Sequence, residues 1–166
     1  MNNTVEITET SSGLSPRTRS VIITAAAIIV LFLPYGYQID IGPGPNGFMA
    51  ILWELKEFRV VGQGMPGIEF LTALEYFIYY LYRFVVLHAI WKYSTGKEKP
   101  GKLVIHGFIG ELIPLLIDIP AVLILEPGTG HNYIPIMVPI PFLFIYCLVL
   151  VLFDYKRRNF PASKAT

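Results

Sequence analysis

The fold is decided by two apolar stretches that contain charged residues, LTALEYFIYYLYRFVVLHAIW (71–91) and LVIHGFIGELIPLLIDIPAVLIL (103–125). The first holds Glu75 and Arg83, and the second holds Glu111 and Asp118. An ionised side chain at the centre of a lipid bilayer costs at least about 2.5–3.5 kcal/mol on insertion scales. Four such residues in one short chain are not expected by chance. The pattern predicts a membrane protein with a polar interior, and each of the four residues is a candidate functional residue.

Composition agrees with this interpretation. The chain has 166 residues, of which 54% are hydrophobic and 15% charged, and its mean hydropathy is +0.55. Soluble domains have about 45–50% apolar residues. The formal net charge of +1 gives no overall field that would recruit nucleic acid, so we expect no nucleic-acid partner. Cys147 is the single cysteine, which excludes an internal disulfide and a thiolate metal cluster.

Four segments are each near the roughly 20 residues that a helix needs to cross the hydrocarbon core. They cover about residues 20–39, 67–91, 103–125 and 134–153. Because lipid offers no partners for backbone amides, such segments should be helical. The predicted fold class is therefore all-α, a polytopic bundle of four transmembrane helices over residues 20–153, with a polar tail at 1–19 and a basic tail at 154–166.

The basic residues favour one orientation. Only Lys56 and Arg59 fall in the predicted outer loop, and Arg83 lies within a span. Both termini are therefore predicted to be cytoplasmic. A cleaved signal peptide is the alternative for residues 20–39, but Pro34-Tyr35-Gly36-Tyr37 does not resemble a cleavage site. The ten basic residues on the predicted cytoplasmic side are Arg17, Arg19, Lys92, Lys97, Lys99, Lys102, Lys156, Arg157, Arg158 and Lys164.

The predicted outer loop, residues 40–66, has its own apolar periodicity. Its apolar residues follow helical spacing, which predicts a short amphipathic helix at the membrane surface, with Asn46 as a possible N-cap. The apolar positions are Phe48, Ile51, Leu52, Leu55 and Phe58.

The charged side chains of residues 71–91 and 103–125 form helical stripes. Glu75, Tyr79, Tyr82 and Arg83 have the spacing i, i+4, i+7, i+8, and Glu111, Pro114 and Asp118 have the spacing i, i+3, i+7. The short connection at 94–102 predicts that these two helices are antiparallel neighbours. If the stripes meet, Arg83 pairs with Glu111. Glu75 and Asp118 then lie together and hold a shared proton or cation. We expect Pro114 to kink its helix beside them.

Two cofactors enter as weaker hypotheses. His88 and His106 lie at similar depth on the two predicted helices and are candidate ligands of a b-type haem, although they need not face the polar stripe. The tyrosines of residues 71–91 could bind a quinone, although packing and hydrogen bonds explain them as well. No zinc motif is present in the sequence, and no cofactor is the primary expectation.

The sequence leaves three functions open. The first is a small non-enzymatic subunit of a membrane complex, with the lipid bilayer and other membrane proteins as partners in a homo- or hetero-oligomer. The second is a proton- or cation-coupled transporter or channel in which Glu75, Asp118, Glu111, Arg83, Tyr79 and Tyr82 bind the ion and Pro114 flexes. The third, an enzyme, has the least support, because no nucleophile–base pair or phosphate loop is visible.

Overall fold

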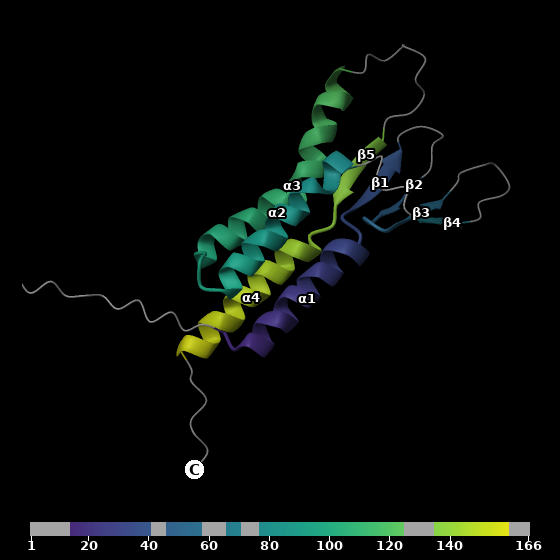
Figure 1. Cartoon of the computed structure of the whole chain (residues 1–166). Coiled ribbons are helices and arrows are strands. Elements are labelled where there is room, and N and C mark those ends of the chain that lie inside the picture. The colour runs from purple at the N-terminus through teal and green to yellow at the C-terminus, as the bar shows by residue number, and fades with distance from the viewer. Residues whose placement is uncertain (1–13, 41–45, 58–65, 71–76, 125–134, 160–166) are drawn as a thin grey trace, which may run out of the picture.

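A computed structural model describes residues 14–40, 46–57, 66–70, 77–124 and 135–159 of the chain. Within these ranges four helices and five strands occur (Figure 1). The helices are α1 (Pro16–Phe32), α2 (Phe77–Ser94), α3 (Pro100–Ile124) and α4 (Phe142–Asn159). The strands are β1 (Gly36–Asp40), β2 (Asn46–Met49), β3 (Trp53–Glu57), β4 (Pro66–Phe70) and β5 (Pro135–Pro139).

The five strands form one antiparallel sheet in the order β4-β3-β2-β1-β5. Figure 1 shows the sheet at one end of an elongated helical layer. β1 follows α1 and β5 precedes α4, and the pairing of β1 with β5 holds these two helices together at the sheet end. The N- and C-terminal parts of the described chain are therefore joined through the sheet.

Local sequence explains where α1 begins and ends. The side chain of Ser15 accepts a hydrogen bond from the Thr18 amide at 3.2 Å, and Pro16 follows it at the first helical position. The helix ends at Phe32, with Leu33 already extended. Pro34 disfavours helical geometry at the residue before it, so the chain turns there into β1.

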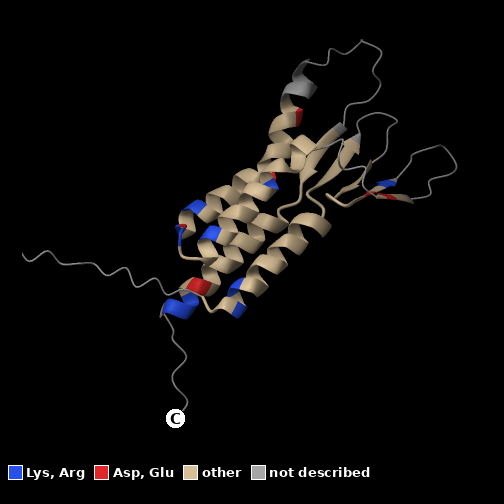
Figure 2. Cartoon of the chain, in the orientation of Figure 1, with Lys and Arg blue, Asp and Glu red and all other residues tan. Residues whose placement is uncertain are grey.

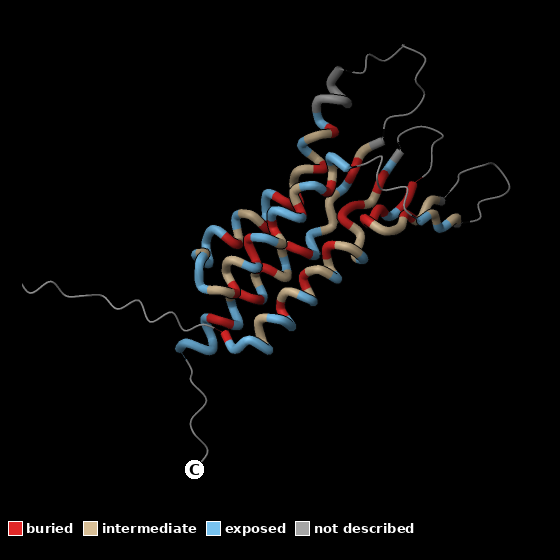
Figure 3. Tube along the Cα trace, viewed as in Figure 1, coloured by how far each residue is buried: buried red, intermediate tan, exposed pale blue. Residues whose placement is uncertain are grey.

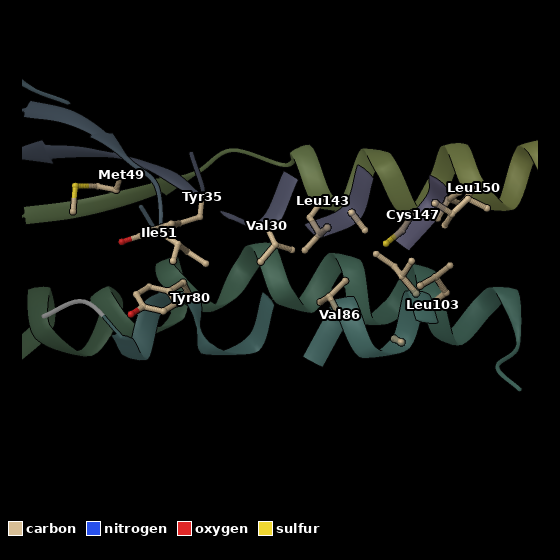
Figure 4. Packing of buried hydrophobic residues seen from close by; sticks show 14 of the residues in the cluster. Val30, Tyr35, Met49, Ile51, Tyr80, Val86, Leu103, Leu143, Cys147 and Leu150 are labelled. Carbon is tan, nitrogen blue, oxygen red and sulfur yellow. The ribbon is translucent and has the colours of Figure 1, made fainter. Parts of the chain in front are cut away.

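The helices pack around a core of small and branched side chains. Figure 4 shows Val30, Val86, Leu143 and Cys147 gathered between the helices. All four are fully buried. α2 and α3 are antiparallel neighbours, as the short connection predicted, and Gly96 supplies the positive φ of 75° in the turn between them. This hairpin brings the charged stripes of α2 and α3 side by side.

The predicted all-α architecture is wrong. A five-stranded sheet accompanies the four helices, and none of the helices in the described part of the chain has both the length and the apolar character needed to cross a membrane. The predicted four-helix transmembrane bundle and the multi-pass membrane localisation with cytoplasmic termini are overturned with it. The predictions of transmembrane helices and of an integral membrane protein are wrong for the same reason.

The error came from treating each apolar run as a single helix. Three of the four runs are divided between a helix and a strand. The run at 20–39 ends in β1, the run at 67–91 begins in β4, and the run at 134–153 begins in β5. Only the run at 103–125 is one continuous helix, α3. Proline cannot supply an amide for a helical hydrogen bond, and Pro34 lies between α1 and β1 while Pro141 directly precedes α4.

The predicted amphipathic helix in residues 40–66 is also wrong. The described residues of this segment form β2 and β3, and Phe48 pairs across them with Leu55. Asn46 is a strand residue opposite Glu57, not an N-cap. Trp53 and Leu55 alternate with the polar residues Glu54 and Lys56, which is the two-residue period of a strand. The same segment therefore fits both the helical and the strand period.

Most of the described basic residues gather at one end of the molecule, the exceptions being Lys56 in β3 and Arg83 in α2. Figure 2 shows the gathered residues at the end of the helical layer that lies away from the sheet. The ends of all four helices contribute. The described members are Arg17, Arg19, Lys92, Lys97, Lys99, Lys102, Lys156, Arg157 and Arg158.

Candidate functional site

Arg83 and Glu111 form a buried ion pair between α2 and α3. Nη2 of Arg83 donates to Oε1 of Glu111 at 3.2 Å and to Oε2 at 3.5 Å. The two residues are 1% and 4% exposed, so water does not screen the pair. A single guanidinium nitrogen reaches both oxygens, whereas a fork would use two nitrogens. The structure thus brings together the two residues that helical spacing paired.

The second amino group of Arg83 serves a different helix. Nη1 donates to the carbonyl oxygen of Leu33, the C-cap of α1, at 3.2 Å. The indole nitrogen of Trp53 donates to the carbonyl of Phe32 at 2.9 Å. The last carbonyls of a helix have no partner within it and carry partial negative charge. A guanidinium at this place therefore satisfies α1 chemically and electrostatically.

Glu111 interacts with the N-terminus of α4, as Arg83 does with the C-terminus of α1. Its Oε1 accepts the Leu143 amide at 2.8 Å, in the first turn of that helix. Amides at a helix N-terminus lack helical partners and carry partial positive charge, so a carboxylate stabilises them. Arg83 and Glu111 together connect the end of α1, the beginning of α4, and the helices α2 and α3 on which they stand.

Burial acts on both partners of the pair. Desolvation lowers the pKa of Arg83 below its ordinary value, and Glu111 opposes this. Desolvation raises the pKa of Glu111, and Arg83 and the amide of Leu143 oppose this. The guanidinium stays charged, because arginine does not lose its proton in proteins. The ring of Tyr35 lies 5.9 Å from the guanidinium carbon and gives it a further favourable neighbour.

Asp118 lies two stripe positions beyond Glu111 along α3. It is 4% exposed, and its two oxygens accept from Tyr79 on α2 at 2.7 Å and from the amide of Met137 in β5. The bond to Met137 fixes β5 against α3, in the same way that Glu111 fixes α4. The two carboxylates of α3 therefore hold consecutive elements, β5 and α4.

The remaining predicted residues are more scattered. Tyr82 bonds to Nδ1 of His106 at 2.9 Å and does not reach the ion pair. Pro114 is buried near the midpoint of α3, which bends along its course in Figure 1. Glu75 lies outside the described residues, so its expected pairing with Asp118 stays a prediction.

The two histidines considered for haem have separate surroundings. His88 stacks on Trp91 with ring centroids 5.5 Å apart, and His106 bonds to Tyr82. In the described ranges no group of three or more His, Cys, Asp or Glu side chains is arranged to hold a metal ion. The geometry gives no observation in favour of haem or quinone.

Sequence reasoning missed the backbone partners and three further polar contacts. Tyr93 donates to Asp154 at 2.9 Å, and Asp154 pairs with Arg158 at 2.7 Å. Glu54, 1% exposed, pairs with Lys56 at 2.6 Å. The i, i+4 spacing of Asp154 and Arg158 is a signal that could have found one of them. The carbonyl of Leu33 and the amides of Leu143 and Met137 leave no signal in the side-chain sequence.

The comparisons with known proteins give no family for this chain. No family model, curated protein or solved structure matches it. Its function has to be inferred from the geometry alone. Figure 3 shows where that geometry concentrates: buried segments run along the inner sides of the helices and continue into the sheet.

Proposed function

We propose that the protein is a non-enzymatic subunit of a larger protein assembly, in which helices of other subunits cover its helical layer. The observation that carries this proposal is the set of apolar side chains on the outward faces of the helices. Soluble monomers rarely expose contiguous apolar patches larger than a few hundred Å². A helix that is apolar on both sides is normally covered on both sides.

α4 carries the clearest such face. Its inner side buries Leu143, Cys147 and Leu150. On its outer side Ile145, Val149 and Leu152 are 50%, 55% and 64% exposed, spaced i, i+4, i+7. Spacing of this kind packs knobs into holes against a second helix. The outer side of α4 is therefore suited to a partner helix with a matching stripe.

α3 repeats the arrangement. Ile105 and Ile109 are 57% and 38% exposed, and Leu116 and Ile119 further along are 56% and 44% exposed. The spacing i, i+4, i+11, i+14 follows one helical face. Two neighbouring helices thus present outward apolar stripes, which together make a surface for more than one partner helix.

The buried charges suit a structural role in such a subunit. Each of Arg83, Glu111 and Asp118 bonds to groups of other elements of this chain. Buried ionic groups can fix the register of packed helices. These contacts support a structural role for the three residues, which is to hold the helices in the geometry needed for assembly. The role of these residues in binding an ion stays a prediction, and no described contact favours it.

The experiment is native mass spectrometry of the full-length protein purified from its own cells, with Val149→Lys as the test variant. We expect wild-type protein to carry partner chains, and the variant to lose them because a lysine cannot enter an apolar helix contact. Arg157→Gln, at an exposed position of the same helix, is the matched control and should keep the partners.

Two outcomes overturn the proposal. One is a wild-type protein that carries no partner chain. The other is binding of the isolated protein to phosphatidylcholine vesicles that Val149→Lys abolishes, which assigns the stripes to a lipid surface.

A further inference from the structure

The helical layer is strongly positive at the end that lies away from the sheet. The nine basic residues gathered there come from all four helices: two from the first turn of α1, four from the last turn of α2 through the first turn of α3, and three from the last turn of α4 (Figure 2). We call them the basic end. Glu98 and Asp154 are the acidic residues beside them, so this part of the described chain carries an excess of seven positive charges. The formal net charge of the whole chain is only +1, which hides this concentration.

The charges of the basic end face outward. Seven of the nine residues are exposed, and Arg19 and Lys92 are half-buried. Within the described ranges only Arg158 among them forms an ion pair, with Asp154 at 2.7 Å. Most of this charge is therefore available to attract an anionic partner outside the chain.

Aromatic side chains stand among these charges. Trp91, directly before Lys92, is 40% exposed, and Tyr155, directly before Lys156, is 65% exposed. Nζ of Lys97 lies over the Trp91 ring, 5.7 Å from its centroid. Trp and Tyr combine an apolar ring with a polar group, and they are enriched where proteins meet lipid headgroups, as Lys and Arg are. The combination favours a lipid surface over a water-soluble anion.

A nucleic acid fits these observations less well. Single strands are bound in a groove that follows their backbone, with bases stacked on exposed aromatic rings. Here the charges come from the ends of four helices, and the Trp91 ring already contacts Lys97 and stacks on His88 with ring centroids 5.5 Å apart. An acidic peptide would pair with the lysines but would leave the exposed aromatic rings without an apolar partner.

We propose that the basic end binds the anionic headgroups of a membrane surface, and that Trp91 and Tyr155 enter the headgroup region beside them. The contact is peripheral and requires no helix that crosses the bilayer. The helices then stand on the membrane with the sheet at the far end of the molecule (Figure 1). Because the outward stripes of α3 and α4 stay available to partner helices, this inference does not depend on the proposed function.

The strength of such a contact depends on salt. Each lysine or arginine near an anionic leaflet raises the affinity about fivefold. Exposed charges are screened beyond about 10 Å at about 0.1 M salt and beyond about 3 Å at about 1 M salt. Binding should therefore require anionic lipid and should be lost at the higher salt concentration.

The test is sedimentation of the full-length protein, purified from its own cells, with vesicles at about 0.1 M salt. We expect binding to vesicles of equal parts phosphatidylcholine and phosphatidylserine, and none to vesicles of phosphatidylcholine alone. Lys97→Gln combined with Lys99→Gln should bind the anionic vesicles about 25-fold more weakly. Ile68→Glu combined with Phe70→Glu is the matched control. It lowers the net charge by the same amount at exposed positions of β4, away from the basic end, and should bind as the wild type does.

Tryptophan fluorescence locates the contact, because the chain has two tryptophans. Trp53→Phe leaves Trp91 as the reporter, and its emission should shift to shorter wavelength with the anionic vesicles. In Trp91→Phe the remaining Trp53, in β3, should not shift. Circular dichroism checks that each variant is folded. Val149→Lys should leave binding to the anionic vesicles unchanged, which separates this test from that of the proposed function.

Four results overturn the inference. The first is no binding of the wild type to the anionic vesicles, and the second is equal binding to phosphatidylcholine alone. The third is an equal loss of binding in the lysine variant and in its control on β4. The fourth is tighter binding to a single-stranded oligonucleotide or to polyglutamate than to the anionic vesicles, which would assign the basic end to an acidic polymer.

Discussion

Arg83 and Glu111 join the C-terminal end of α1 to the N-terminal end of α4 through one ion pair of 3.2 Å. The guanidinium lies at the negative end of one helix and the carboxylate at the positive end of the other. Each helix therefore receives the charge that its terminus favours. The pair is placed where α1 passes into β1 and where β5 leads into α4, so it holds the junction between the helical layer and the sheet.

Replacing one partner of this pair should destabilise the protein strongly. Glu111→Gln leaves the buried guanidinium of Arg83 without its counter-charge, and breaking a buried pair in this way costs about 3–5 kcal/mol. Urea unfolding measures the change in free energy. Arg83→Met combined with Glu111→Leu should cost less than Glu111→Gln alone, because no charge stays buried. The exposed change Lys99→Gln is the control, and a Glu111→Gln cost no larger than that of the control would contradict the role given to the pair.

Asp118 should contribute through its charge. Asp118→Asn keeps the shape of the side chain but weakens two charge-assisted hydrogen bonds, to Tyr79 and to the Met137 amide. Hydrogen bonds to charged groups are worth about 1.5–3 kcal/mol each. Hydrogen exchange of the Met137 amide should accelerate in Asp118→Asn. In Tyr79→Phe it should stay slow, since that variant leaves the bond to β5 in place. Slow exchange in both variants would show that Asp118 does not hold β5.

Gly47 should not tolerate a side chain. A Cβ at this position would lie 1.9 Å from the carbonyl oxygen of Leu55 in the paired strand, and backbone there cannot move aside without breaking the β2–β3 pairing. We expect Gly47→Ala to lower the melting temperature by more than about 3 °C, since about 1 kcal/mol corresponds to about 2–4 °C in a chain of this size. Gly101→Ala is the matched control, because a Cβ there has no atom within 4 Å. An unchanged melting temperature in Gly47→Ala would mean that β2 and β3 are not paired as described.

The thiol of Cys147 should be unreactive in the folded protein. Burial raises its pKa to about 12, from an ordinary value of 9.0. The thiolate is the reactive form, so labelling by iodoacetamide at pH 8 should be slow and should become fast in urea. Rapid labelling of the folded protein would contradict this environment. Because the folded state holds the proton more tightly, this group's contribution to stability is complete below pH 9 and is lost as the pH rises toward 12.

The charged stripes were the part of the site that sequence could predict. Arg83 and Glu111 stand on two helices joined by a tight turn, so helical periodicity and a short connection were enough to bring them together. Tyr79 and Asp118 stand on the same two stripes, although the sequence analysis paired Asp118 with Glu75 and not with Tyr79. What these groups do was not predictable, because their other partners are backbone atoms of Leu33, Leu143 and Met137, far away in the sequence.

The sheet was missed for a related reason. Residues 53–57, WELKE, alternate between apolar and polar as a half-buried strand does, yet the apolar residues around them also fit a helix. In β1 and β5 the apolar side chains of Tyr37 and Val138 gave no hint of a strand, because they lay in runs long enough to be taken for spans. Short apolar runs are ambiguous between helix and strand until their length and flanking prolines are weighed.

By itself the sequence determined the helix α3, the hairpin that α3 forms with α2, and the ionisable residues that this hairpin would bring together. These depend on spacing within a few turns and on one short connection. The tertiary structure alone decided where the other apolar runs change from helix to strand. That choice depends on where each backbone amide finds its partner, and β1 finds its partner in β5, about a hundred residues along the chain. It also decided which side chains of the sheet are covered, because Met49 and Met137 are buried whereas their strand neighbours Phe48 and Val138 are exposed.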